Sequence, residues 1–425
     1  MLIPLIWSLT TERYGANRLD IRVSHMRCKN YQNSRCFFKD HLGSIFIKNL
    51  LPKKAGLRKT GYTVLPLHYG HAPEWLTSRM KRLSDGLVRL IVEEYGAREF
   101  LRRLSDPLWF QAFGCALGFD WHSSGLTTVV TGVLKDVLTL DRHSVMVAGG
   151  KGRASRKTQP EIEEIGNLLG LSSMKIEEMK YASRMAAKVD TAAVQDGYPI
   201  YHHTFFVSEA GEWGVVQQGL NVDERLARRY HWLSERVESF VEEPHTGIAG
   251  WAVAPQVLDM TAKLSAENRK VCVDLVRGNP SNLITSIRRL ASQDMPLESW
   301  TTGATLSQNY LAYSMPHRLD WHIFHQLYDR QPKDYEELLA FKGVGPSTVR
   351  ALALVSELVY GTPACWQDPV KFSFAHGGKD GLPFPVKREV MDESIRMLKG
   401  AVESLELGRK EVVMTLKRLE QLTHR

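Results

Sequence analysis

The hydrophobic pattern of this chain becomes regular only from about Thr60, and from there it predicts helices and strands in succession. Apolar side chains recur at helical spacing in several segments, and two short segments alternate around a turn as a β-hairpin does. The first half of the patterned region therefore mixes both elements. Helices are expected at 73–94, 97–104, 126–138, from 160 onward, and at 181–194 and 225–232, and strands at 144–148, 200–207 and 213–218.

The second half is predicted to be almost entirely helical. From Ala254 the pattern stays helical as far as about Tyr328, and two short helices follow between Asp334 and Tyr360. The expected fold class is α+β and predominantly helical, with a mixed α/β domain first and an all-α domain after it. The expected divisions are 1–58 as a poorly ordered basic extension, 59–245 as the α/β domain, 254–362 as the helical domain and 363–425 as a Gly- and Pro-rich loop with a C-terminal helix.

The most informative segment joins the last two helices through a Gly-Val-Gly sequence at 343–345. Glycine adopts φ > 0 and leaves no side chain between the turn and a ligand, and Pro346 suits a first helical turn. The N–H groups that begin the helix then face outward, where the helix dipole helps them to bind a phosphate. The residues expected to contact nucleic acid here are Lys342, Gly343, Val344, Gly345, Ser347 and Thr348.

This segment resembles the helix-hairpin-helix motif of DNA repair and recombination proteins. The resemblance rests on the two short helices, the glycine spacing and an apolar face that includes Leu338, Val344 and Leu352. Phosphate contacts position a duplex without reading its bases, so the implied partner is DNA bound independently of sequence. The alternative is a helical hairpin with an ordinary glycine turn.

The net charge of +8 is concentrated at the start of the chain. Residues 1–58 contain eleven Lys or Arg and three Asp or Glu, whereas the rest contains 44 of each sign. The segment is either a basic arm that gains affinity for nucleic acid by releasing counterions or an extension in front of the folded domain. The extension is favoured because regular patterning starts only at Thr60. The overall charge is then weak evidence for nucleic-acid binding.

Composition also argues against two classes of protein. No stretch approaches the roughly 18 apolar residues that a membrane span needs, and the first residues lack the basic region of a signal peptide. The five cysteines form no Cys-x-x-Cys pair, so neither a disulfide framework nor a zinc finger is indicated. A cytoplasmic protein without a membrane partner is expected.

Residues 149–157 form a glycine-rich basic segment between an expected strand and an expected helix. Thr158 and Glu161 have the spacing of a capping box, which predicts the start of that helix. The spacing of a Walker loop is absent, so nucleotide hydrolysis is not indicated. A flexible contact with nucleic acid is the favoured role, and a solvated loop is the alternative. The four positive charges are Lys151, Arg153, Arg156 and Lys157.

Polar side chains gather between residues 181 and 218, where the pattern predicts buried structure. Strand alternation sends His202 and His203 to opposite faces of the hairpin. If the hairpin turns at Ala210, His203 lies opposite Gln217 and His202 lies opposite Gln218. Catalytic roles are therefore considered for Lys188, Asp196, His202, His203 and Gln217.

Some of these residue types are ligands for a divalent metal. Asp196 and His203, with Asp120 and His122 from an aromatic-rich segment upstream, supply carboxylate and imidazole groups suited to magnesium, manganese or zinc, with magnesium or manganese favoured. Such an ion would polarise a phosphodiester and activate a water. No spacing here is a specific metal signature. The alternative is a satisfied polar network in which Asp196 only makes an Asp-Gly turn.

A family resemblance covers the chain from about Leu57 to its C-terminus. It rests on the motifs LPLHYGHAP (65–73), FDWHSSG (119–125), AGGKG (148–152), VQDG (194–197), YHHTF (201–205), VQQG (216–219), RRYHW (228–232) and FAHGGKDG (374–381). By these motifs the chain resembles domain-of-unknown-function family 763. The family implies no catalytic residues. The first 56 residues fall outside the resemblance, which supports an N-terminal extension.

The leading hypothesis is a DNA repair or recombination protein in which the hairpin grips the backbone and the α/β region cuts phosphodiesters with magnesium or manganese. A non-enzymatic DNA-binding adaptor comes second. A base-excision glycosylase comes third, because some of those enzymes use this hairpin. Its catalytic Asp would follow the hairpin, and Asp368 in a Pro-rich context matches that position poorly.

Overall fold

A computed structural model describes residues 72–119, 124–250, 254, 256–292, 314–316 and 318–370. Contacts divide the chain into two units, and every described residue belongs to the unit Gly56–Met391. The predicted metal ligands Asp120 and His122 lie outside the described residues. None of the described helices is both long enough and apolar enough to cross a bilayer.

The described part of the chain begins with five helices, and the sequence pattern located three of them well. The helix starting after Pro73 has the predicted leucine and methionine stripe, with Met80 and Leu83 buried. It ends at Gly96, whose φ of +85° suits glycine. The five are α3 (Glu74–Tyr95), α4 (Ala97–Leu104), α5 (Pro107–Ala116), α6 (Ser124–Val137) and α7 (Leu140–His143).

A five-stranded antiparallel sheet forms the centre, in the order β1-β3-β4-β5-β6. The β3–β4 hairpin has the predicted register, because His203 pairs with Gln217 and His202 with Gln218. The strands are β1 (Val145–Lys151), β3 (Ile200–Ser208), β4 (Trp213–Asn221), β5 (Leu226–Leu233) and β6 (Gly247–Ala249).

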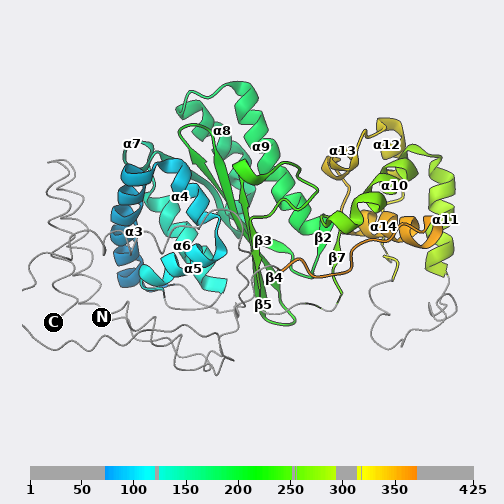
Figure 1. Cartoon of the computed structure of the whole chain (residues 1–425), viewed down its shortest axis with the longest axis horizontal. Coiled ribbons are helices and arrows are strands. Elements are labelled where there is room, and N and C mark those ends of the chain that lie inside the picture. Colours follow the sequence, from blue (N-terminus) through cyan, green and yellow to red (C-terminus); the bar gives the residue numbers. More distant parts are fainter. Residues whose placement is uncertain are drawn as a thin grey trace, which may run out of the picture. The chain divides into compact units, whose positions relative to one another are not determined.

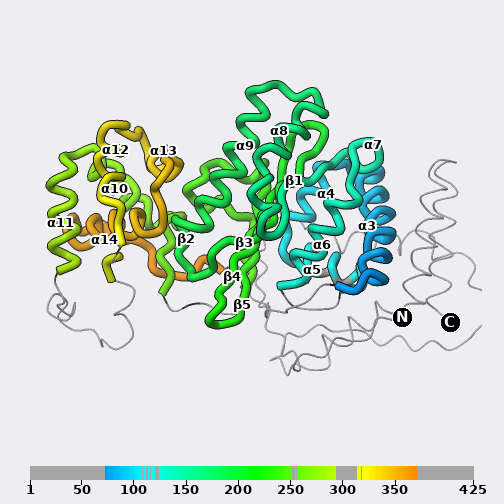
Figure 2. The backbone as a smooth tube through the Cα atoms, turned by 180° about the vertical axis from the view of Figure 1, so that it is seen from behind, coloured from blue at the N-terminus to red at the C-terminus, as the bar shows by residue number. Residues whose placement is uncertain are grey.

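Helices cover both faces of this sheet (Figures 1 and 2). Helices α4 and α6 pack on one face, and α8 (Thr158–Leu168) and α9 (Ser173–Lys188) pack on the other. The side chain of Ser172 accepts a hydrogen bond from Lys175 N at 3.2 Å and so caps the start of α9. With both faces covered, the central strands bury nearly every residue.

The helix predicted over 225–232 is wrong, because this segment is strand β5. The error has a physical cause. A strand buried on both faces shows no alternation of polar and apolar residues, and in β5 the polar residues Arg228 and Arg229 are themselves buried and paired. Their charge suggested a solvated helix face, whereas each side chain enters a buried network.

The predicted capping box at Thr158 and Glu161 is also wrong. Helix α8 has Lys157 at its N-cap position and no side-chain cap. Thr158 donates instead to Ser155 O at 2.8 Å. Glu161 accepts from Gly149 N and from Lys135 Nζ, both at 2.6 Å, and so ties the end of β1 to α6 and α8.

Apart from two short strands, the regular elements in the rest of the described chain are helices. Strand β2 (Val194–Gln195) pairs with β7 (Leu258–Asp259). The helices are α10 (Ala266–Arg277), α11 (Pro280–Ser292), α12 (His322–Arg330), α13 (Tyr335–Ala340) and α14 (Pro346–Tyr360). The predicted class, α+β with a predominance of helix, is confirmed.

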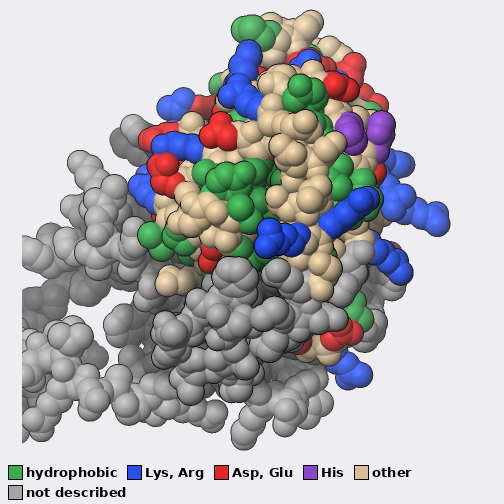
Figure 3. Space-filling view, turned by 90° about the vertical axis from the view of Figure 1, so that its right-hand side faces the viewer, with side chains coloured by type: hydrophobic (Ala, Val, Ile, Leu, Met, Phe, Trp, Pro, Cys, Tyr) green, Lys and Arg blue, Asp and Glu red, His purple; other side chains and the backbone are tan. Residues whose placement is uncertain are grey.

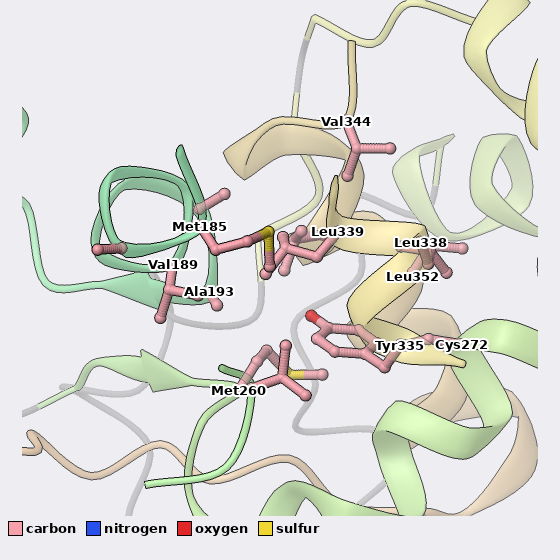
Figure 4. Close-up of a cluster of buried hydrophobic side chains, with 14 of the residues drawn as sticks. Met185, Val189, Ala193, Met260, Cys272, Tyr335, Leu338, Leu339, Val344 and Leu352 are labelled. Carbon is pink, nitrogen blue, oxygen red and sulfur yellow. The ribbon is translucent and has the colours of Figure 1, made fainter. Parts of the chain in front are cut away.

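One hydrophobic core connects the sheet region to the helical region. After α9 the chain makes a π-helical turn, η2 (Val189–Ala193). Met185 of α9 lies beside Leu339 of α13, and Val189 of η2 belongs to the same hydrophobic core (Figure 4). All three side chains are at most 1% exposed, so the hairpin of α13 and α14 is fixed against α9.

Candidate functional site

The turn between α13 and α14, which we name the glycine turn (Lys342–Gly345), is held by short-range contacts. Val344 N donates to Phe341 O at 3.2 Å, and Val349 N donates to Gly345 O at 3.0 Å. Gly343 has a φ of +99°, and a Cβ there would lie 2.9 Å from Ile323 Cδ1. Val344 is 1% exposed and anchors the turn in the core. The turn is therefore well defined and requires glycine at 343.

The beginning of α14 presents hydrogen-bond donors that are not used within the described part of the chain. There, the N–H groups of Gly345, Ser347 and Thr348 donate to no acceptor. A Cβ added to Gly345 would meet nothing within 4 Å, so the side of Gly345 toward which a side chain would point is open. Unused N–H groups at the positive end of a helix dipole are suited to an anion.

The side chains predicted to contact nucleic acid at this turn divide into two sets. Lys342 is exposed and Ser347 is partly exposed, so both can reach a ligand. Val344 and Thr348 are 1% and 4% exposed, so their side chains serve the packing of the hairpin. Neither side chain can contact a ligand at the turn, and of the two backbone N–H groups that of Val344 already donates to Phe341 O.

A segment from the sheet region holds both ends of the glycine turn. Lys188, the last residue of α9, places its Nζ 3.4 Å from Phe341 O. Gln195 Nε2 donates to Pro346 O at 2.8 Å. Tyr181 on α9 adds a 2.8 Å hydrogen bond to Glu336 on α13. These contacts were not predicted, because they join residues about 150 positions apart.

The four residues of the basic segment, Lys151, Arg153, Arg156 and Lys157, are all exposed. Lys151 ends β1 opposite His202 of β3, and the other three lie on the 3-10 helix η1 (Gly152–Lys157). The segment is thus an ordered turn of helix with positive charge on its surface. That arrangement is compatible with a nucleic-acid contact or with a solvated face.

The predicted catalytic residues His203 and Gln217 belong to a buried network. His203 Nε2 lies 2.9 Å from Ser183 Oγ, and its Nδ1 lies 2.7 Å from Gln217 Oε1. Burial lowers the pKa of His203 and favours its neutral form. Gln217 Nε2 donates to Asp190, which also binds His245.

Asp190 and His245 were missed by the sequence analysis. Asp190 is 1% exposed and also accepts from Trp232 Nε1 at 3.0 Å. The one available signal was a lone acid within the apolar run Val189–Val194. Three side chains bind the carboxylate of Asp190, two of them from strands β4 and β5. Asp190 therefore connects η2 to the sheet through buried hydrogen bonds.

Asp196 lies in a second buried network. Its carboxylate accepts from Arg228 Nη1 at 3.0 Å, from Tyr230 OH at 2.6 Å and from Tyr198 N at 3.0 Å. Arg228 also pairs with Asp368, whose side chain is fully buried. Burial raises the pKa of Asp196 to about 6, against the attraction of Arg228. Both carboxylates are therefore occupied by structural partners.

His202 faces the opposite side of the sheet from His203, as the alternation predicted. Its Nε2 lies 2.9 Å from Thr131 Oγ1 on α6, and it is 1% exposed. Burial lowers the pKa of His202 to about 3, so the imidazole is neutral at physiological pH. Within the described ranges, its Nδ1 and Oε1 of the neighbouring Gln218 have no hydrogen-bond partner. Because His202 is buried among the described residues, its ring is not open to a substrate there.

The described residues do not assemble the predicted metal ligands. Asp196 and His203 bind different partners in separate networks. Within the described ranges, no group of three His, Cys, Asp or Glu side chains is placed to hold an ion. Among the described residues, Asp196 and His203 therefore do not share an ion, and a magnesium or manganese site that also uses Asp120 and His122 stays a prediction.

The end of α14 carries a second exposed feature. Leu358, Val359 and Tyr360 are 37%, 51% and 58% exposed. Figure 3 shows hydrophobic side chains on this side of the helical region, with basic and acidic side chains around them. On the face drawn in Figure 3, charged side chains lie among the hydrophobic ones, so the described surface there is not one continuous apolar patch.

Comparison with protein families gives a match that covers most of the chain. The family described as protein of unknown function (DUF763) matches residues 61–386. The chain belongs to this family. The DUF763 match includes the glycine turn, the basic segment and both buried networks, and it begins after the basic N-terminal segment. No curated protein and no solved structure matches the chain.

Proposed function

We propose that this protein binds DNA through the sugar-phosphate backbone, with the glycine turn as the contact. The observation that supports this most is the group of unused N–H donors at Gly345, Ser347 and Thr348, with open space in front of Gly345. A phosphate oxygen is the ligand that such donors bind well. The resemblance to the helix-hairpin-helix motif supports a role in repair or recombination.

The chemistry of the turn makes this binding independent of sequence. Backbone N–H groups and one lysine contact phosphates, which are the same at every base pair. Lys342 adds a positive charge beside the turn, and the basic segment at 151–157 supplies four more on the surface. Each lysine or arginine that neutralises a phosphate releases counterions, so affinity falls as salt rises.

Metal-dependent cleavage is a separate hypothesis from backbone binding. The described residues provide no ligand set for it, and Asp368, considered for glycosylase chemistry, has a buried side chain paired with Arg228. The proposal is therefore a DNA-binding activity. Cleavage by magnesium or manganese is tested as an additional outcome of the binding experiment.

The test uses the full chain and fluorescently labelled DNA. Two duplexes of unrelated sequence, and one single strand, are titrated by fluorescence anisotropy at several salt concentrations. We expect equal affinity for the two duplexes and weaker binding at higher salt. The same mixtures, in EDTA, magnesium or manganese, are run on a denaturing gel to detect strand cleavage.

A charge reversal at the turn tests the location of the contact. Lys342→Glu should weaken binding by about tenfold or more, because a carboxylate replaces a cation near a phosphate. Lys263→Glu is the matched control, since Lys263 is exposed in the same helical region and changes the net charge equally. Equal loss in both variants, or absence of binding by the wild type at low salt, would overturn the proposal.

A further inference from the structure

The basic segment and the glycine turn lie at the same end of helix α9. Helices α8 and α9 pack side by side (Figures 1 and 2). Lys180 Nζ lies 3.0 Å from the carboxylate of Glu163. One turn further along α9, Arg184 Nη1 donates to Gln159 Oε1 at 3.2 Å, one turn earlier in α8. The two helices therefore run in opposite directions, and the start of α8, with η1 directly before it, lies beside the last turn of α9.

The last turn of α9 also contacts the glycine turn. Lys188, the last residue of the helix, has its Nζ 3.4 Å from Phe341 O, where the chain enters the turn. Arg184 is four residues before Lys188, so both side chains lie on one face of α9. That face meets the glycine turn at Lys188 and the start of α8 at Arg184. It therefore connects the glycine turn to the basic segment.

Exposed cations lie along this connection. Lys342 is exposed in the glycine turn, next to the residue that Lys188 contacts. Arg184 is exposed on α9, between the turn and the start of α8. The basic segment adds four exposed cations at the end of β1 and along η1. We name these residues the cationic strip: Lys342, Arg184, Lys151, Arg153, Arg156 and Lys157.

The carboxylates of the described elements around the strip lie elsewhere or have partners. Glu161, in the first turn of α8, is paired with Lys135, and Glu336 on α13 accepts from Tyr181 OH. The other acids of α8 and α9 lie from the level of Lys180 to the connection between the helices, and they are Glu163, Glu164, Glu177 and Glu178. The positive end of this helix pair is therefore the end at the glycine turn, which suits a polyanion.

We propose that one DNA duplex lies along the cationic strip and contacts the glycine turn and the basic segment at the same time, with Arg184 between them. This inference rests on the proposed DNA binding and adds the extent of the interface to it. The DNA is bound as one continuous backbone, and the turn and the basic segment are two parts of a single site.

The length of the strip determines how much DNA it can contact. Packed helices lie about 8–10 Å apart, so the steps from the turn to α9 and from α9 to α8 together span about 20 Å. A duplex rises about 3.4 Å per base pair, so this distance corresponds to about six base pairs. A duplex is stiff over that length. A phosphate held at the turn therefore places others of the same duplex near Arg184 and η1.

The first test substitutes the middle of the strip. The full chain is titrated with a labelled duplex of about 12 base pairs, twice the estimated span. Fluorescence anisotropy is measured at about 0.15 M salt, where the Debye length of about 8 Å restricts each charge to its near surroundings. Arg184→Glu should weaken binding by about fivefold or more, and Arg184→Lys, which keeps the charge, should bind within about twofold of the wild type.

Lys175→Glu is the matched control for the charge reversal. Lys175 lies in the first turn of the same helix, nine residues before Arg184 and so about 14 Å away along the axis. The substitution changes the net charge as Arg184→Glu does, and affinity should stay within about twofold of the wild type. Thermal unfolding of each variant verifies that the fold is retained.

The second test counts the duplexes bound by each chain. Native mass spectrometry, at concentrations well above Kd, should show saturation at one 12-base-pair duplex per chain, because the turn and the basic segment are occupied by the same DNA. Two duplexes per chain would show two separate sites and would overturn the inference. Poly-L-glutamate at equal charge is the competitor, and it should displace the duplex only weakly.

The outcomes distinguish this inference from the proposed function. Unchanged affinity in Arg184→Glu, together with a loss in Lys342→Glu, overturns the continuous interface and leaves DNA binding at the turn in place. Equal losses in Arg184→Glu and Lys175→Glu show a general effect of net charge and also overturn the strip. Displacement by poly-L-glutamate as effective as by DNA assigns the strip to acidic peptides instead. Absence of binding to any duplex by the wild type overturns both.

Discussion

The polar residues of the central sheet and those of the glycine turn differ in how fully their hydrogen-bonding groups are used. In the buried networks that involve the sheet, the carboxylate of Asp196 accepts from three donors and that of Asp190 from three more. At the turn, the N–H groups of Gly345 and Ser347 have no acceptor within the described residues, and Lys342 is exposed. The sheet is closed to ligands, and the turn is open to them.

This difference teaches that residue type is a poor guide to function in this chain. Histidine and aspartate are common catalytic residues. In this chain, however, His203 and Asp196 form hydrogen bonds with other buried side chains. Glycine and a helix start have no chemistry of their own, yet they leave donors exposed for a ligand. Substitutions in the buried networks should change the unfolding free energy most, and those at the turn should change it less. A substitution in the basic segment should have the smallest effect, on DNA affinity.

The largest effect is expected from removing the cation of the second buried network. Arg228→Met leaves the carboxylates of Asp196 and Asp368 without their buried partner. The free energy of unfolding should fall by roughly 3–5 kcal/mol, measured by denaturant unfolding. Arg156→Ala, an exposed control, should change it by less than about 0.5 kcal/mol. A loss as small as the control's would show that the network is not structural.

Acid should weaken the sheet through its buried histidines. The pKa of His202 is lowered from 6.5 to about 3, so the native state excludes a proton that the unfolded state accepts. Its stabilisation is complete above pH 6.5 and is lost as pH falls toward 3. Between pH 7 and pH 5 the unfolding free energy should drop by about 2 kcal/mol for this residue.

His202→Gln tests that assignment by the slope of stability against pH. The variant should lose about 2 kcal/mol of the wild-type drop between pH 7 and pH 5. His325→Gln replaces an exposed histidine on α12 and should keep the wild-type slope. An unchanged slope in His202→Gln would mean that His202 is accessible to protons in the folded protein.

The two glycines of the turn should behave differently. Gly343→Ala places a side chain at φ +99° and close to Ile323, so the unfolding free energy should fall by about 1–2 kcal/mol. Gly345 has an extended backbone, and an added Cβ would meet nothing within 4 Å. The unfolding free energy of Gly345→Ala should therefore match that of the wild type within about 0.5 kcal/mol. Thermal unfolding of both variants measures this. Equal destabilisation would contradict the open geometry at Gly345.

The smallest effect is expected at the basic segment. Arg153→Ala removes one exposed charge, so DNA affinity should fall about two- to threefold at low salt and the salt slope should decrease by about one. Salt titrations of binding measure both quantities. No change in either would favour the solvated-loop interpretation of this segment.

Local patterns predicted the parts of the fold that depend on near neighbours. The register of the β3–β4 hairpin followed from alternation and a short turn, and α4 was located to the residue. Strand β5 was predicted as a helix because Arg228 and Arg229, both buried, removed its alternation. Burial of charge depends on partners elsewhere in the chain, which a local pattern does not contain.

The candidate site was predictable at the turn and not around it. Glycine spacing and Pro346 marked the helix start directly. The support from Lys188 and Gln195 depends on how α9 and β2 meet the hairpin, and that arrangement follows from tertiary packing. The same packing decided that Asp196 and His203 belong to different networks.

The most direct test of the account compares two glycine-to-alanine variants in duplex DNA binding. Gly345→Ala and Gly132→Ala each add a methyl group where nothing lies within 4 Å, and only the first lies at the turn. The account predicts that Gly345→Ala lowers affinity by about tenfold, since the methyl displaces the phosphate from its donors, while Gly132→Ala binds as the wild type does. Equal affinity for all three proteins would contradict DNA binding at the glycine turn.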